Sequence, residues 1–169
     1  MIKKLSITTN MNTMKGLTLI ELMVTLAVVA ILVAIGLPRL QGMSAGNRMA
    51  STINSLAADL ALARSEAINR NRTFVITASG GWANGWIVSA PPMPSAPTPI
   101  NNFSSRGPVP NGMTFVESGG LLTITYLNTG IRANTANLVF TLCATGKSSR
   151  IININATGRY TTSLGAICP

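Results

Sequence analysis

The residues of this chain that are able to do chemistry are few. The sequence of 169 residues has no histidine and only four acidic residues, Glu21, Asp59, Glu66 and Glu117. A metal site or a paired-carboxylate site would lack ligands, and a Ser or Cys nucleophile would have no histidine base. No phosphate-binding loop motif occurs either. We expect a protein that is not an enzyme and that needs no metal or cofactor.

The two cysteines, Cys143 and Cys168, lie near the C-terminal end, and their spacing matches no CxxC or zinc-binding pattern. In an exported chain such a pair is typical of one disulfide bond. It would close a loop of about 25 residues and stabilise the fold by roughly 3 kcal/mol on the chain-entropy model. We therefore predict a structural disulfide rather than a reactive thiol pair.

A second candidate site is basic and also lies near the C-terminal end. Lys147, Arg150 and Arg159 fall within thirteen residues, with Tyr160 beside Arg159 and no acidic residue among them. Lys and Arg contact phosphates without reading sequence, and a tyrosine ring can stack on a base. These four are the candidate DNA-binding residues. The alternative is that they are ordinary surface charges on a chain whose formal net charge is +9.

The elements that position these residues begin with an apolar run of 21 residues, 17–37. As a helix it spans about 30 Å, the thickness of a bilayer core. It is longer than the roughly 7–15 apolar residues of a signal peptide. Glu21 lies inside the run, at a cost on the order of a few kcal/mol in hydrocarbon, and such residues usually mark function and have a partner. Charges flanking the run favour a cytoplasmic N-terminus only slightly.

Residues 15–21, KGLTLIE, resemble the type IV prepilin processing site, with Leu17 in place of the common Phe. The resemblance implies that prepilin peptidase cuts after Gly16, that the new N-terminus at Leu17 is methylated, and that Glu21 is the fifth mature residue. Residues 1–16 are then the leader. We expect the true start at Met11, with Met1 and Met14 as the other candidates.

Cleavage would create an amine inside the apolar layer, close to a carboxylate. Glu21 of one subunit would pair with the Leu17 amine of a neighbouring pilin or pseudopilin. An uncompensated buried charge costs more than the pair contributes, so the pair would set the helix register in a filament. The alternative is that Glu21 merely reaches water near a helix end. Pro38 closes segment 17–38 where pilins commonly carry a proline, and we expect it to bend the helix.

Residues 39–72 continue as an amphipathic helix. Apolar residues step by three and four along one face, and the opposite face is polar. The expected buried stripe is Met49, Ile53, Leu56, Leu60, Ala63 and Ala67, and the expected polar face is Arg48, Asn54, Asp59 and Arg70. Residues 63–70, ARSEAINR, resemble the GspH/FimT family of minor pilins and pseudopilins. Glu66 and Arg70 also form an i,i+4 pair, worth a few tenths of a kcal/mol.

Residues 73–169 are predicted to form a β-rich head. Short strands are expected at 73–78, 85–89, 113–116, 121–126, 138–142 and 150–155, with a last one near 159–161. Residues 90–112 contain seven prolines and predict a long surface loop. Trp82 and Trp86 are expected in the core or at a sheet edge. The fold class is α+β, a long N-terminal helix packed on antiparallel sheets as in pilins.

The leading interpretation is a minor type IV pilin that primes or caps pilus assembly. It would cross the bacterial inner membrane once, with a periplasmic head, and contact other pilins. Alternatives are a GspH-type minor pseudopilin of type II secretion and an unprocessed membrane-anchored domain. A further alternative is DNA binding for natural transformation. Residues 157–161, TGRYT, resemble the Gly-Arg-x-Arg signature of FimT-type subunits at Gly158 and Arg159, with Thr161 at the second Arg.

Overall fold

A computed structural model of the chain describes residues 18–95 and 97–169. These residues divide between two compact units, Met1–Gln41 and Gly42–Pro169. Helix α1 (Leu19–Asn69) contributes to both units. The predicted leader, residues 1–16, and the predicted mature N-terminus, Leu17, lie outside the described residues. The cleavage site therefore stays a prediction.

In the first unit, α1 begins with a local capping arrangement. The N–H of Glu21 donates to the Oγ1 of Thr18, 3.3 Å away, which satisfies one of the unpaired N–H groups at the helix start. A threonine followed three residues later by a glutamate is the capping-box sequence. The stretch Leu19–Gly36 is long and apolar enough to cross a membrane, and none of it is buried by the rest of the chain.

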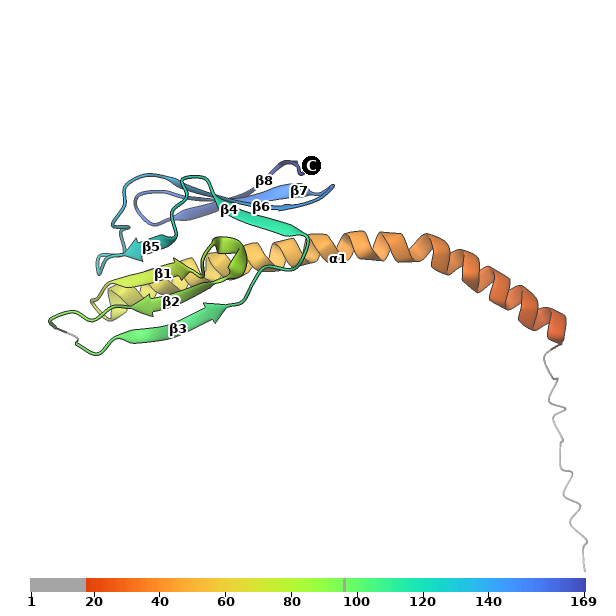
Figure 1. Cartoon of the computed structure of the whole chain (residues 1–169), viewed down its shortest axis with the longest axis horizontal. Coiled ribbons are helices and arrows are strands. Elements are labelled where there is room, and N and C mark those ends of the chain that lie inside the picture. Colours follow the sequence, from red (N-terminus) through yellow and green to blue (C-terminus); the bar gives the residue numbers. More distant parts are fainter. Residues whose placement is uncertain (1–17, 96) are drawn as a thin grey trace, which may run out of the picture. The chain divides into compact units, whose positions relative to one another are not determined.

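In the second unit, the later turns of α1 pack with two four-stranded antiparallel sheets (Figure 1). The first sheet has the order β3-β2-β1-β5, made of β1 (Phe74–Ala78), β2 (Trp86–Ala90), β3 (Ile100–Arg106) and β5 (Thr123–Tyr126). The second has the order β4-β6-β7-β8, made of β4 (Met113–Glu117), β6 (Leu138–Ala144), β7 (Ser148–Ile154) and β8 (Tyr160–Ile167). A short 3₁₀ turn, η1 (Trp82–Asn84), joins β1 to β2. The α+β prediction is confirmed.

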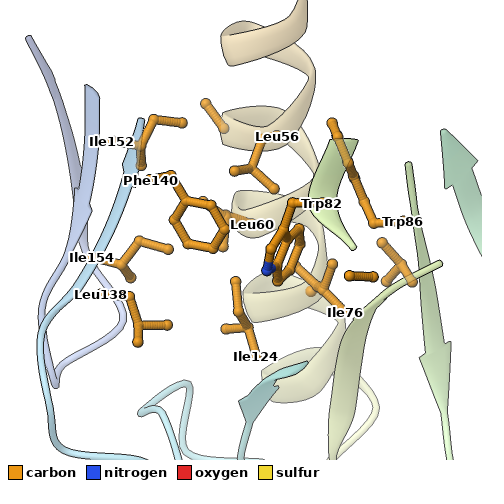
Figure 2. Packing of buried hydrophobic residues seen from close by; sticks show 14 of the residues in the cluster. Leu56, Leu60, Ile76, Trp82, Trp86, Ile124, Leu138, Phe140, Ile152 and Ile154 are labelled. Carbon is orange, nitrogen blue, oxygen red and sulfur yellow. The ribbon is translucent and has the colours of Figure 1, made fainter. Parts of the chain in front are cut away.

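The core lies where α1 meets the inner faces of both sheets. Figure 2 shows Leu56 and Leu60 of α1 among side chains from the two sheets and η1. The rings of Trp82 and Phe140 meet edge to face, 4.7 Å between centroids, a favoured aromatic geometry. Both tryptophans are buried, as predicted. The whole apolar stripe expected on the helix is buried too: Met49, Ile53, Leu56, Leu60, Ala63 and Ala67.

The loop predicted over 90–112 is wrong for residues 100–106, which form β3. This strand pairs with β2, for example Ile87 with Ser105. Prolines precede and follow residues 100–106 but do not occur within them. Because β3 is the outer strand of its sheet, flanking prolines cost it no ladder hydrogen bond. The last strand was also underestimated, since β8 continues to Ile167 instead of ending near residue 161.

Candidate functional site

The first candidate surface is the apolar part of α1. Its large apolar side chains, from Leu19 to Ile35, are between 48% and 78% exposed within the chain. Glu21 is the one acidic residue in the described part of this segment, and it is exposed as well. A face of this kind requires hydrocarbon or other apolar helices around it. Pro38 falls inside α1, but its side chain lies outside the described set, so the bend stays a prediction.

The predicted disulfide is confirmed between Cys143 and Cys168, with 5.7 Å between their Cα atoms. It joins β6 to the residue that follows β8. The N–H of Cys168 donates to the carbonyl oxygen of Lys147 at 2.8 Å, which extends the same attachment through the backbone. The C-terminal end of β8 is therefore fixed covalently to the sheet.

The four candidate DNA-binding residues do not form one patch. Lys147 lies in the turn before β7, whereas Arg159 and Tyr160 lie at the turn between β7 and β8. The hairpin pairs Ser148 with Ile167 at one end and Ile154 with Tyr160 at the other. At about 3.3 Å per residue, seven residues of strand separate the two ends by roughly 20 Å. Only Arg159 and Tyr160 are neighbours.

Helix α1 supplies residues that the sequence did not place near Arg159. Ala61, Arg64, Ser65 and Ile68 of α1 line a pocket of about 360 Å³ together with Gly158, Arg159 and Tyr160. The Arg64 Nε donates to the carbonyl oxygen of Gly130 at 2.9 Å, so this arginine also attaches the helix to a loop. The pocket thus gathers two arginines, a tyrosine and an exposed isoleucine.

A second pocket, of about 320 Å³, lies further along β8. Ile53 and Asn54 of α1 line it with Arg150 of β7 and with Thr162, Ser163 and Leu164 of β8. We call the two pockets together the α1–β8 groove. The residues that line it include three arginines and no acidic residue.

The Gly-Arg turn has a structural reason. Gly158 has φ +79°, and an added Cβ would lie 2.6 Å from Cε1 of Tyr126 and 2.9 Å from the carbonyl oxygen of Gly130. Only glycine fits such a site. The Tyr126 hydroxyl donates to the carbonyl oxygen of Gly158 at 3.2 Å, and burial raises the pKa of Tyr126 to about 12. The turn is therefore explained by packing whether or not Arg159 binds anything.

Asp59 was predicted on the polar face of the helix, and this is wrong. Its side chain is 1% exposed, and its carboxylate accepts hydrogen bonds from Trp86 Nε1 at 2.9 Å and Arg106 Nε at 2.9 Å. Ser104 Oγ donates to it as well, at 3.1 Å. These partners come from β2 and β3, so helical periodicity alone gave no signal for them.

The other two carboxylates of residues 42–169 are also engaged within the chain. Glu66 pairs with Arg70 one helical turn away, as predicted. The Glu117 Oε2 accepts from the N–H groups of Gly119 at 2.9 Å and Leu121 at 2.7 Å. This unit contains nine Lys or Arg residues and three acidic residues, a net charge of +6. Its outward charge is therefore almost entirely positive.

Comparisons with known proteins find matches to pilin-type families for both the N-terminal apolar segment and the head. A family model described as "Type II transport protein GspH" matches residues 52–158, and one described as "Prokaryotic N-terminal methylation motif" matches residues 11–37. Two crystal structures of the type IV minor pilin FimU from Pseudomonas aeruginosa resemble the fold. Their TM-scores are 0.61 and 0.57, at 20% and 21% identity, over 75% and 70% of this chain and 99% and 98% of theirs. Among curated proteins, no sequence matches this chain.

Proposed function

Because the chain belongs to the family of the type II transport protein GspH, whose model spans residues 52–158, we propose that it is a minor pilin that primes or caps a type IV pilus. Prepilin peptidase removes residues 1–16, and Leu17 becomes the methylated N-terminus. Segment 17–38 stays in the inner membrane, with the β-rich head in the periplasm, until the subunit joins other pilins.

The observation that supports this proposal is the single carboxylate on the exposed apolar helix. Glu21 lies among side chains that other helices would cover in a filament. A neighbour's Leu17 amine is a counter-ion of the right sign at the right depth. Leaving one member of such a buried pair alone costs about 3–5 kcal/mol, which is roughly a factor of 10² to several thousand in assembly. The capping bond with Thr18 uses the backbone N–H of Glu21, so the carboxylate can serve an intermolecular partner.

The test is Glu21→Ala in the natural host, with Thr25→Ala as the matched control. Thr25 lies one turn further along, and in the described structure its hydroxyl donates to the Leu22 carbonyl of its own helix. We expect mass spectrometry to find an N-terminus at Leu17 in both variants. Sheared filaments should contain the Thr25 variant but little of the Glu21 variant. Equal incorporation of both would refute the pairing, and a retained leader would refute the cleavage.

The family description gives a specific reason to keep the pseudopilin of type II secretion as a second candidate. The two machines differ in what is lost when the gene is deleted. If the chain is a minor pilin, deletion of its gene should abolish surface pili. If it is a minor pseudopilin, deletion should make secreted proteins accumulate in the periplasm. Scoring both phenotypes in one deletion strain separates the candidates, and neighbouring genes give an independent answer.

DNA binding is a third candidate, supported by the neighbouring Arg159 and Tyr160 at the end of the α1–β8 groove. Few cations are involved, so binding would be weak and would fall steeply with salt. A gel shift with the full chain in detergent micelles, at several salt concentrations, tests it. Arg159→Ala should weaken the shift several-fold, while Arg48→Ala, in the helix outside the groove, should not. Equal loss in both variants, or no salt-sensitive shift, removes this candidate.

A further inference from the structure

Strand β8 is an outer strand, and its one common protective feature in the described structure is a register shift opposite Ser148–Arg150. One of its edges pairs with β7, and the other is unpaired in the described structure. Its eight residues, YTTSLGAI, include no charged residue and no proline, and all except Gly165 are exposed. Soluble proteins usually blunt such edges with charge, proline or short length, because unpaired N–H and C=O groups recruit further strands. This edge is therefore suited to receive a strand.

Apolar surface beside this edge is also uncovered. Leu164 and Ile167 of β8 are 66% and 73% exposed, whereas Leu138 and Leu142 of the same sheet are buried. Leu164 lines the second pocket of the α1–β8 groove, beside Ile53 and Asn54 of the helix. The helix thus covers the inner strands of the sheet but leaves β8 partly open. A strand added beside β8 would close this part of the groove.

The charge around the groove defines the partner. Arg150 lines the second pocket, and in residues 42–169 the three side-chain carboxylates are all bound elsewhere. No salt bridge in the described part of the chain involves Arg150. A second copy of this head would bring another strongly positive surface, which repels. An acidic residue on the incoming strand is what the groove lacks.

We propose that β8 accepts an added β-strand from a different pilin-type subunit, one with apolar residues at alternate positions and an acidic residue that reaches Arg150. Main-chain hydrogen bonds along β8 supply the affinity, and the pocket beside Leu164 supplies the side-chain selection. The disulfide at Cys168 keeps the edge in place before binding. Only the identity of the partner rests on the proposed function; the strand-accepting edge does not.

The test uses the full chain in detergent micelles and two synthetic peptides of eight residues. Both peptides alternate valine with threonine. At the central positions the threonines are replaced by glutamate in one peptide and by lysine in the other. Hydrogen exchange is measured by mass spectrometry. We expect the glutamate peptide to slow exchange in residues 160–167 at least tenfold, with little change in β5, the short outer strand of the other sheet. The lysine peptide should have no effect.

Two variants test the role of charge. Arg150→Gln should weaken binding of the glutamate peptide by about tenfold, while Arg48→Gln, which lies outside the groove, should bind it as the parent does. Unchanged binding in Arg150→Gln overturns the assigned partner charge. Equal protection by both peptides, or none by either, overturns the proposal. The proposal is also overturned if a DNA duplex of 20 base pairs protects β8 and the glutamate peptide does not.

An experiment in cells identifies the partner. A photo-reactive phenylalanine analogue replaces Ser163, and cross-linked peptides are sequenced. We expect the cross-link to map to an acid-containing extended segment of another subunit with an N-terminal apolar helix. A cross-link to nucleic acid, or to a second copy of this chain, overturns the proposal. If the peptide protects β8 but the chain never joins filaments, the proposal that β8 accepts a strand is supported and only the proposed function is refuted.

Discussion

Replacing Asp59 with alanine should lower the unfolding free energy of the head by about 2–4 kcal/mol. The largest loss is at Trp86, whose buried indole N–H would have no acceptor, a penalty of about 1–3 kcal/mol. The Ser104 hydroxyl loses a charged acceptor as well. The guanidinium of Arg106 contributes less, because its side chain is 43% exposed and regains water.

The same helix offers a matched control. Glu66 also pairs with an arginine, but its partner Arg70 is exposed and lies only four residues away. Glu66→Ala should therefore cost only a few tenths of a kcal/mol. Asp59→Asn, which keeps one acceptor oxygen but loses the charge, should fall between the two.

The assay is urea unfolding of the full chain in detergent micelles, followed by tryptophan fluorescence and circular dichroism. The midpoint should shift with an unchanged slope, which shows that stability and not compactness has changed. If Asp59→Ala loses less than about 1 kcal/mol, comparable to Glu66→Ala, then the bonds to Trp86 and Ser104 do not stabilise the fold as argued.

Three further predictions concern the region around β8. Gly158→Ala should cost more than about 2 kcal/mol in urea unfolding, while Gly146→Ala, also at positive φ but with open space, should cost about 1 kcal/mol. The pKa of Tyr126 is raised to about 12 in the folded chain. The contribution of its neutral hydroxyl to the unfolding free energy is therefore complete below pH 10 and is lost as pH rises towards 12. Alkaline unfolding of the parent should therefore show this loss, and Tyr126→Phe should not; an identical pH profile in both would contradict the assignment. Replacing Cys143 and Cys168 together by serine should cost roughly 3–3.5 kcal/mol for the 25-residue separation, measured as a shift in the urea midpoint.

Local patterns in the sequence predicted the elements well. The helical stripe from Met49 to Ala67 and most strands were found because burial repeats at 3.6 or 2 residues. The disulfide was found because two cysteines offer one pairing. The apolar helix was predicted from the length and composition of residues 17–37, and Thr18 and Glu21 also fit a local capping sequence at its start.

What the sequence did not predict depends on contacts between distant segments. Asp59 lies three residues after Leu56 and four before Ala63, at the flank of the buried stripe, and was assigned to the polar face because of its charge. Its burial as an acceptor depends on β2 and β3. Residues 100–106 were assigned to a loop because the prolines around them dominated the pattern, although the edge position tolerates those prolines. The basic candidates were grouped by sequence distance, whereas the hairpin carries Lys147 and Arg159 to opposite ends.

The uncovered apolar stretch of α1 restricts where this chain can exist. Moving each of its exposed valine, leucine and isoleucine side chains into water would cost about 1.5–3 kcal/mol. The free subunit therefore needs hydrocarbon around this part of the helix. Lipid tails and the flanks of other apolar helices are nearly equivalent surroundings for these side chains. Transfer of the subunit from the bilayer to a bundle of apolar helices would then change its hydrophobic free energy very little. Specific contacts, such as hydrogen bonds and ion pairs, would decide which of the two surroundings is more stable.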